Sequence, residues 1–231
     1  MLSASIVLEG KRNMKESGVK KGALREAYII FKNGVFYRNP VLIGALGLYP
    51  VAAAGYSLKN GVALSLMMLV MMLPVCFVTG LLGGRVPLWL RPGVVLLLSA
   101  ICYLPAWLLV QEALPDVVSG LGPYAPLMIC NSVILSRAND YAPDHISLAV
   151  VADSLGCTLG FSAVICLFSM FREVLSAKTL WGYGVPFGGA VGNAASLPFF
   201  GFLLLGFFAA WVQNVNNRKK RRKIRKKAVK Q

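Results

Sequence analysis

The sequence predicts an all-α integral membrane protein, on the evidence of its composition, its uncharged runs and its basic residues. Of 231 residues, 57% are hydrophobic and 14% are charged, whereas soluble globular chains carry roughly 25% charged residues. Lys and Arg number 24 against 9 Asp and Glu, which gives a net charge of +15. A hydrophobic chain this basic is typical of membrane proteins with cationic cytoplasmic segments. The composition therefore argues against a soluble enzyme domain.

Long uncharged runs predict six transmembrane helices. Twenty uncharged residues separate Arg38 from Lys59, and 25 separate Lys59 from Arg85. A helix needs about 20 apolar residues to cross the hydrocarbon core. The predicted spans are residues 41–58, 61–82, 93–110, 121–136, 146–171 and 194–215.

The spans form a predicted membrane domain over residues 39–216, with a basic segment on either side. The N-terminal segment, residues 1–38, lacks the ordered regions of a cleavable signal peptide, so we expect a cytoplasmic lead-in. The C-terminal segment is a basic tail over residues 217–231.

The basic residues also predict the topology. If Met1 is cytoplasmic, eight Lys and Arg precede the first span, three lie in inside loops and ten lie in the tail, so 21 of 24 are inside. The three outside are Lys59, Arg172 and Lys178. Since Lys and Arg near a span resist translocation, this bias predicts that both termini are cytoplasmic.

The basic run at residues 218–223 has two interpretations. It could contact nucleic-acid phosphates, or it could hold the chain against anionic lipid, to which each basic residue contributes roughly 1 kcal/mol. The tail contains no aromatic residue on which bases could stack. We therefore expect anionic lipid at the basic termini and no nucleic-acid partner.

Two of the predicted helices are interrupted at matching positions. Tyr49-Pro50 interrupts the first, and Cys130-Asn131-Ser132 interrupts the fourth. Tyr49 lies nine residues after Pro40 and Ser132 lies nine residues after Pro123, so 83 residues separate the two prolines and also the two interrupting residues. This spacing predicts a 3+3 inverted repeat whose broken first and fourth helices form a site near the midplane. The alternative is a proline kink plus a packed polar residue.

Several segments then point to a known family. Residues 39–50, NPVLIGALGLYP, resemble the opening of the E subunit of Rnf electron-transport complexes, which is similar to the D subunit of the sodium-pumping NADH:quinone reductase. Further matches in the same order are residues 126–138, 153–161, 171–175, 179–182, 197–198 and 202–206. On these motifs the chain is identified as a divergent member of this family, over about residues 39–208.

The resemblance implies a six-helix, inverted-repeat subunit of the bacterial cytoplasmic (inner) membrane. Such a subunit pairs with the homologous A subunit of opposite topology, alongside the other Rnf subunits. Two cysteines from each chain of the pair would hold one intramembrane [2Fe–2S] cluster. The whole complex would couple ferredoxin and NAD redox chemistry to sodium or proton movement, and a cytoplasmic N-terminus fits the E subunit better than the A subunit.

The sequence departs from the family at the two cluster positions. Tyr49 stands before the first-helix proline, and Ser132 follows the fourth-helix asparagine, where the family has cysteines. Iron–sulfur clusters are held by thiolates, and a phenol with a pKa of about 10 is a poor substitute. Cys130 is an alternative ligand, although two positions on a helix rotate a side chain by about 200°. We therefore expect the cluster to be absent or altered.

Three further residues are candidates for an ion path or for structural roles: Pro50, Asn131 and Asp153. An intramembrane carboxylate such as Asp153 suggests a proton or cation relay, but it could equally be a helix-end acid satisfied by water or backbone. Arg172 and Glu173 could pair with each other or with a partner subunit.

These observations leave three functional hypotheses. The first is a non-catalytic membrane subunit of an Rnf-like, ion-translocating ferredoxin:NAD oxidoreductase complex, retained as a scaffold or ion-path component. The second is a small inverted-repeat transporter whose site includes Tyr49, Asn131 and Ser132. The third is a membrane scaffold whose basic tail recruits a cytoplasmic partner.

Overall fold

The structure is a computed structural model. It describes residues 30–31, 41, 44, 46–145, 147–184, 186 and 192–228, with the backbone alone for residues 84, 123, 147, 192–193 and 216–228. Most of the predicted N-terminal segment and the last residues of the tail lie outside the described residues. The predicted boundaries of the N-terminal segment therefore stay predictions.

Four long helices dominate the described part of the chain. They are α2 (Leu58–Leu82), α3 (Arg91–Ala113), α6 (Ser147–Ala177) and α7 (Pro198–Ala228). Each contains a stretch long and apolar enough to cross a membrane: Leu58–Leu82, Arg91–Ala113, Leu148–Ala177 and Pro198–Val215. These helices confirm the predicted all-α fold class and coincide with the predicted second, third, fifth and sixth spans.

The predicted fourth span is divided into short helical pieces. They are α4 (Pro115–Leu121), η4 (Gly122–Tyr124), η5 (Pro126–Cys130), α5 (Ser132–Ser136), η6 (Arg137–Tyr141) and η7 (Ala142–Asp144). A proline stands in the first turn of four of these pieces, where its missing N–H is tolerated. Pro115–Leu121 and Pro126–Asp144 are bent against each other by 73° and together form a possible fifth, broken span.

The predicted first span is also not one continuous helix. Its described part ends in η2 (Pro50–Ala54), a π-helical turn closed by a hydrogen bond from Gly55 N to Pro50 O. Val51, Ala52 and Ala54 are fully buried in it. The described residues thus contain four or five candidate spans, and the six-helix, 3+3 repeat stays a prediction.

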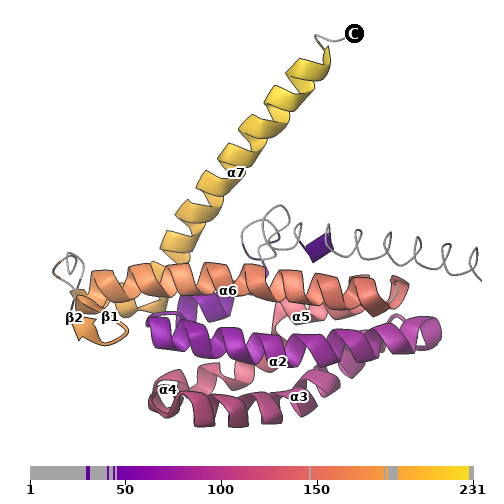
Figure 1. Ribbon diagram of the computed structural model, residues 1–231, viewed down its shortest axis with the longest axis horizontal. Coiled ribbons are helices and arrows are strands. Elements are labelled where there is room, and N and C mark those ends of the chain that lie inside the picture. The colour runs from indigo at the N-terminus through magenta and orange to yellow at the C-terminus, as the bar shows by residue number, and fades with distance from the viewer. Residues whose placement is uncertain are drawn as a thin grey trace, which may run out of the picture.

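α2 lies at the centre of the bundle and packs most extensively against α6 and α3 (Figure 1). Four of its methionines, all fully buried, form the middle of the core: Met67, Met68, Met71 and Met72. α2 and α6 are antiparallel, because Gly61 lies against Ser169 and Gly80 lies against Val150. α7 extends obliquely away from the other helices (Figure 1) and contacts mainly η2 and η8 (Gly192–Ser196).

A two-residue hairpin follows α6, between β1 (Thr179–Leu180) and β2 (Tyr183–Gly184). Its turn residues Trp181 and Gly182 both have positive φ, 59° and 89°, as a two-residue type I′ hairpin turn requires. This small strand pair was not predicted from the sequence.

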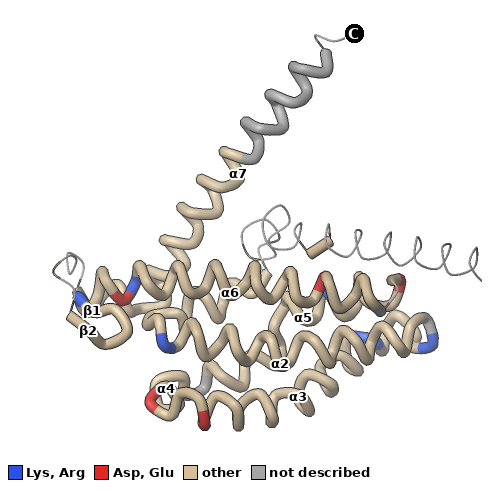
Figure 2. The backbone as a smooth tube through the Cα atoms, viewed as in Figure 1, with Lys and Arg blue, Asp and Glu red and all other residues tan. Residues whose placement is uncertain are grey.

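Charged residues lie toward the two ends of the bundle (Figure 2). Lys59 at the start of α2 shares one end with Arg172 and Lys178, while the opposite end has Arg85, Arg91 and Arg137. These are the two loop groups that the topology prediction placed on opposite sides. The six Lys and Arg residues whose side chains the structure describes divide equally between the two ends, so the predicted orientation depends on the terminal segments and stays a prediction.

Candidate functional site at the two helix breaks

The first break is centred on Gly47, which precedes η2. Its φ is +66°, a left-handed conformation that side-chain-bearing residues rarely adopt. Space is also restricted, because a Cβ there would lie 3.0 Å from Val133 Cγ2 and 3.2 Å from Phe161 Cε2. Gly47 thus allows the first break to approach the fourth-helix region and α6 closely.

The second break is centred on Asn131, between η5 and α5. Its φ of −64° and ψ of 120° take it out of the helix. Asn131 is fully buried, and its Oδ1 accepts a hydrogen bond from Val133 N at 2.9 Å, which caps α5. Its Nδ2 faces the sulfurs of Met128 and Met68 at 3.5 and 3.8 Å.

The two breaks contact each other directly through polar groups. Gly47 N donates a hydrogen bond of 2.7 Å to Ser132 Oγ, across 85 residues of sequence. The Tyr49 hydroxyl donates to the carbonyl oxygen of Leu127. Each hydroxyl therefore binds a backbone group of the opposite break region.

The donors at this contact do not fit an iron–sulfur cluster. Tyr49 and Ser132 present a phenol and an aliphatic hydroxyl, both already hydrogen-bonded to backbone, whereas cluster iron is held by thiolates. Cys130 carries a free, exposed thiol, and Asn131 separates it from the Ser132 position. Among the described residues, no three His, Cys, Asp or Glu side chains are grouped closely enough to hold a metal ion.

Arg172 joins the first break to the end of α6. Its side chain is fully buried, and its guanidinium donates to five backbone carbonyl oxygens. The acceptors are Val51, Ala52, Ala195, Ser196 and Leu197, at 2.6 to 3.5 Å. The first two belong to η2 and the others to η8 and the start of α7, so one cation holds three segments together.

The neighbouring Glu173 holds a different set of groups. Its Oε2 accepts from Leu58 N at 2.6 Å and from Ser57 Oγ at 3.4 Å, at the N-terminus of α2, where a carboxylate is favourable. Its Oε1 accepts from Thr179 Oγ1 and Gly182 N of the hairpin. The hypothesis that Arg172 and Glu173 pair with each other is therefore wrong: both satisfy other groups of this chain.

Asp153 lies on α6 near the opposite end of the bundle. It is 5% exposed, and its Oδ1 is 3.5 Å from Arg137 Nη1. Cys157 Sγ lies 3.8 Å from Oδ2. Asp153 therefore has a cationic partner, and the ion-relay and structural hypotheses both stay open. It belongs to a separate polar cluster, away from the contact between the two breaks.

A comparison with family profiles shows which proteins this sequence resembles. A profile described as "Rnf-Nqr subunit, membrane protein" matches residues 27–209, which contain both breaks, Asp153 and Arg172. The chain belongs to the Rnf-Nqr family. The match and the apolar helices together establish a multi-pass membrane protein and confirm the family indicated by the sequence motifs.

Individual relatives of this Rnf-Nqr chain are divergent. It is 28% identical over 152 residues to the E subunit of the ion-translocating oxidoreductase complex of Aliivibrio fischeri strain MJ11, covering 66% of this chain and 67% of the relative. It is 27% identical over 205 residues to the E subunit of the proton-translocating ferredoxin:NAD(+) oxidoreductase complex of Clostridium ljungdahlii, covering 88% and 96%. The corresponding E subunit from Shewanella loihica is 30% identical over 148 residues, covering 64% of each chain.

Sequence reasoning named Tyr49, Pro50, Asn131 and Ser132 but missed two parts of the arrangement. Gly47 was not identified as a point of close approach, although a glycine two residues before the Tyr49-Pro50 pair was a signal for it. The carbonyl acceptors of Arg172 carried no sequence signal, because any residue provides a backbone oxygen.

Proposed function

We propose that this Rnf-Nqr chain is a membrane subunit of an Rnf-like, ion-translocating ferredoxin:NAD oxidoreductase complex. The single observation that carries the proposal is the family match over residues 27–209. The similar E subunits of other bacteria support it, since the one from Clostridium ljungdahlii aligns with nearly the whole chain. Within the complex the chain pairs with an A-like homologous subunit and performs no catalysis of its own.

We further propose that the chain does not supply its half of the intramembrane [2Fe–2S] site. This is supported by the hydrogen bonds of Ser132 to Gly47 N and of Tyr49 to the Leu127 carbonyl. They use the hydroxyls at the two cluster positions to join the breaks. The break region then acts as a scaffold that fixes the first and fourth segments against each other.

The experiment is purification of the tagged chain from its native membrane in mild detergent. Co-purification with other Rnf-type subunits, in a constant ratio, is the expected result. Recovery of the chain alone, under conditions that keep other membrane complexes intact, would contradict membership in the complex.

Iron analysis of the same preparation tests the second part separately. A Tyr49→Phe/Ser132→Ala variant should retain the iron content and the EPR spectrum of the unaltered complex. Loss of a [2Fe–2S] signal in this variant would show that the two hydroxyls contribute to a cluster.

The transporter hypothesis has no specific observation in its favour. The side-chain polar groups of Tyr49, Asn131 and Ser132 are all engaged within the chain, so they do not line a polar cavity for a substrate. Substrate uptake by vesicles that contain the isolated chain would support the transporter hypothesis.

A further inference from the structure

Two described residues of the N-terminal segment lie against α6. Ile30 and Phe31 are helical and half-buried, and they form the short indigo piece beside α6 in Figure 1. The contact is made at Gly156: a Cβ built there would lie 2.7 Å from the carbonyl oxygen of Phe31 and 3.1 Å from its Cα. The backbone of the N-terminal segment therefore approaches α6 directly.

The face of α6 at this contact carries two glycines. Gly156 and Gly160 are both buried, and because they are four residues apart they lie on the same side of the helix. Small residues at this spacing allow two backbones to approach closely inside a membrane. The atoms nearest the Cβ position of Gly156 are backbone atoms of Phe31, which cannot turn aside as the end of a flexible side chain would. A side chain at position 156 would therefore displace the N-terminal segment.

The contact lies within the apolar part of α6 but nearer to one end. Gly156 follows the first residue of α6, Ser147, by nine positions, which is about 14 Å along the helix axis. The last residue, Ala177, is about 32 Å away in the other direction. Since the candidate span covers Leu148–Ala177, Phe31 meets α6 inside the span, at a shallow depth from its first end.

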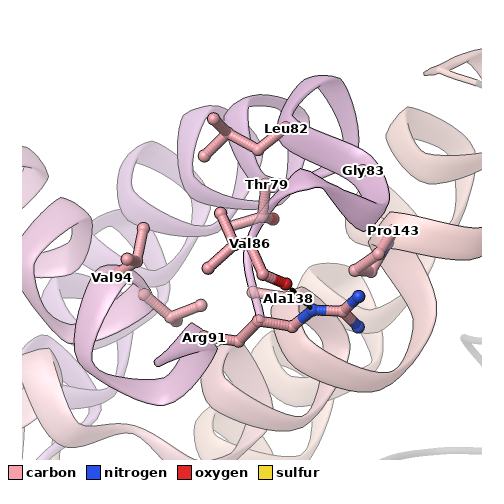
Figure 3. A pocket seen from close by; sticks show the side chains of 9 residues that line it. Thr79, Leu82, Gly83, Val86, Arg91, Val94, Ala138 and Pro143 are labelled. Carbon is pink, nitrogen blue, oxygen red and sulfur yellow. Dashed lines mark hydrogen bonds between the residues drawn. The ribbon is translucent and has the colours of Figure 1, made fainter. Parts of the chain in front are cut away.

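The first end of α6 is the end of the bundle that holds arginines of the short connecting segments. Asp153, six residues after the start of α6, pairs with Arg137 at 3.5 Å. Arg91 lies at the same end, with its guanidinium beside Ala138 (Figure 3). The N-terminal segment thus meets α6 on the side of the membrane that the basic residues predict to be cytoplasmic.

The sequence around the contact suits the boundary of a membrane. Residues 26–31, EAYIIF, lie between Arg25 and Lys32, and so short an apolar stretch cannot cross a core that needs about 20 residues. It can lie in the interface with its apolar side chains inward, while the long basic side chains on either side reach water. The family match begins at residue 27, so Ile30 and Phe31 are inside the matched region.

We propose that the part of the N-terminal segment that contains Ile30 and Phe31 is seated on the Gly156–Gly160 face of α6, at the membrane interface on the Arg137 side of the bundle. This part of the segment braces the membrane domain and is not a free cytoplasmic lead-in. The proposal depends neither on membership in an Rnf-like complex nor on the cluster ligands.

The test is photo-crosslinking of the full-length chain in its native membrane. Phe31→p-benzoylphenylalanine places the photoreactive group at the contact, and proteolysis with mass spectrometry locates its adduct after irradiation. We expect an adduct to the α6 peptide that contains Gly156. The same group at Leu97, which is 63% exposed on α3, should give no α6 adduct. An adduct of position 31 to lipid or to another subunit, in place of α6, would overturn the proposal.

A second substitution in the crosslinking chain tests the need for glycine. Gly156→Leu should lower the yield of the α6 adduct about tenfold, because its side chain overpacks the contact. Gly206→Leu is the matched control, since nothing lies within 4 Å of that Cβ position, and it should leave the yield unchanged. Gly156→Ala should lower the yield by less, and it serves if the leucine variant does not accumulate. An unchanged yield in either Gly156 variant would overturn the proposal.

Discussion

Two regions of this chain give their polar side chains different partners. Around the two helix breaks, Arg172, Ser132 and Asn131 bind backbone groups of the break region. At the end of the bundle that contains η6, Arg137 and Asp153 bind each other. Both arrangements place charge or hydroxyl groups inside an apolar fold, but they satisfy different needs.

The difference shows where broken helices obtain their stability. A backbone group without a partner is costly inside a bilayer, so side chains in the break region replace missing helical hydrogen bonds. Arg137 and Asp153 compensate only each other, and Arg137 Nε still has no hydrogen-bond partner among the described residues. We therefore expect substitutions in the break region to destabilise the chain more than substitutions at the ion pair.

The largest effect is expected from Arg172→Met. It leaves five backbone carbonyl oxygens without this donor, three of them in buried hydrogen bonds, at about 1–3 kcal/mol for each buried group that finds no new partner. The variant should accumulate poorly in membranes and lose at least several kcal/mol of stability. Quantitative immunoblotting of membranes measures this, with Lys178→Gln as the control. Normal accumulation and an unchanged melting temperature would show that water replaces the guanidinium.

Gly47→Ala should have the next largest effect, about 2 kcal/mol, because alanine at positive φ is strained. Its Cβ would also lie 3.0 Å from Val133 Cγ2. Gly206→Ala is the matched control, since that helical position has nothing within 4 Å and alanine favours helix by up to about 1 kcal/mol. The melting temperature in detergent should fall for the first variant and hold or rise for the second. Equal changes in the melting temperature of the two variants would show that the first break does not depend on a close approach at Gly47.

Ser132→Ala should cost about 1–2 kcal/mol, because it leaves the N–H of Gly47 without its acceptor. Ser154→Ala is the comparison, because the Ser154 hydroxyl donates to Val150 O, a carbonyl four residues earlier on its own helix. Loss of the Ser154 hydroxyl should therefore lower the free energy of unfolding by less than loss of the Ser132 hydroxyl. Thermal unfolding of the purified variants distinguishes the two, and an equal loss would mean that the hydroxyl of Ser132 does not join the breaks.

The ion pair should contribute less, with a coupling of about 1 kcal/mol between Arg137 and Asp153. A double-mutant cycle with Arg137→Gln and Asp153→Asn measures this value. A coupling energy as large as the loss of stability in Arg172→Met would contradict the expectation that the break region stabilises the chain more than the ion pair does.

The smallest effect belongs to the other ion pair, Lys59–Asp116. The Asp116 side chain is 80% exposed, and exposed pairs contribute less than about 1 kcal/mol. Lys59→Gln should therefore leave the melting temperature nearly unchanged at moderate salt, and a large decrease would indicate a buried environment in the assembled protein.

The sequence predicted the long helices well and the short segments less well. Uncharged runs determine where α2, α3 and α6 lie, because burial in a bilayer depends on composition. The division of the fourth segment and the π-turn at Pro50 depend on which backbone groups find partners far along the chain. Tyr49 and Ser132 were identified from their positions in a family motif, but their backbone partners Leu127 and Gly47 required the folded structure.

The central claim is that this Rnf-Nqr chain holds its two breaks together with hydroxyls and contributes no cluster ligand. EPR spectroscopy of the reduced, co-purified complex tests it most directly when Cys130, the thiol beside the fourth-helix break, is replaced in Cys130→Ser. We expect the same spectrum and the same iron content as in the unaltered complex. Loss of a [2Fe–2S] signal in the variant would show that the chain supplies a thiolate ligand after all.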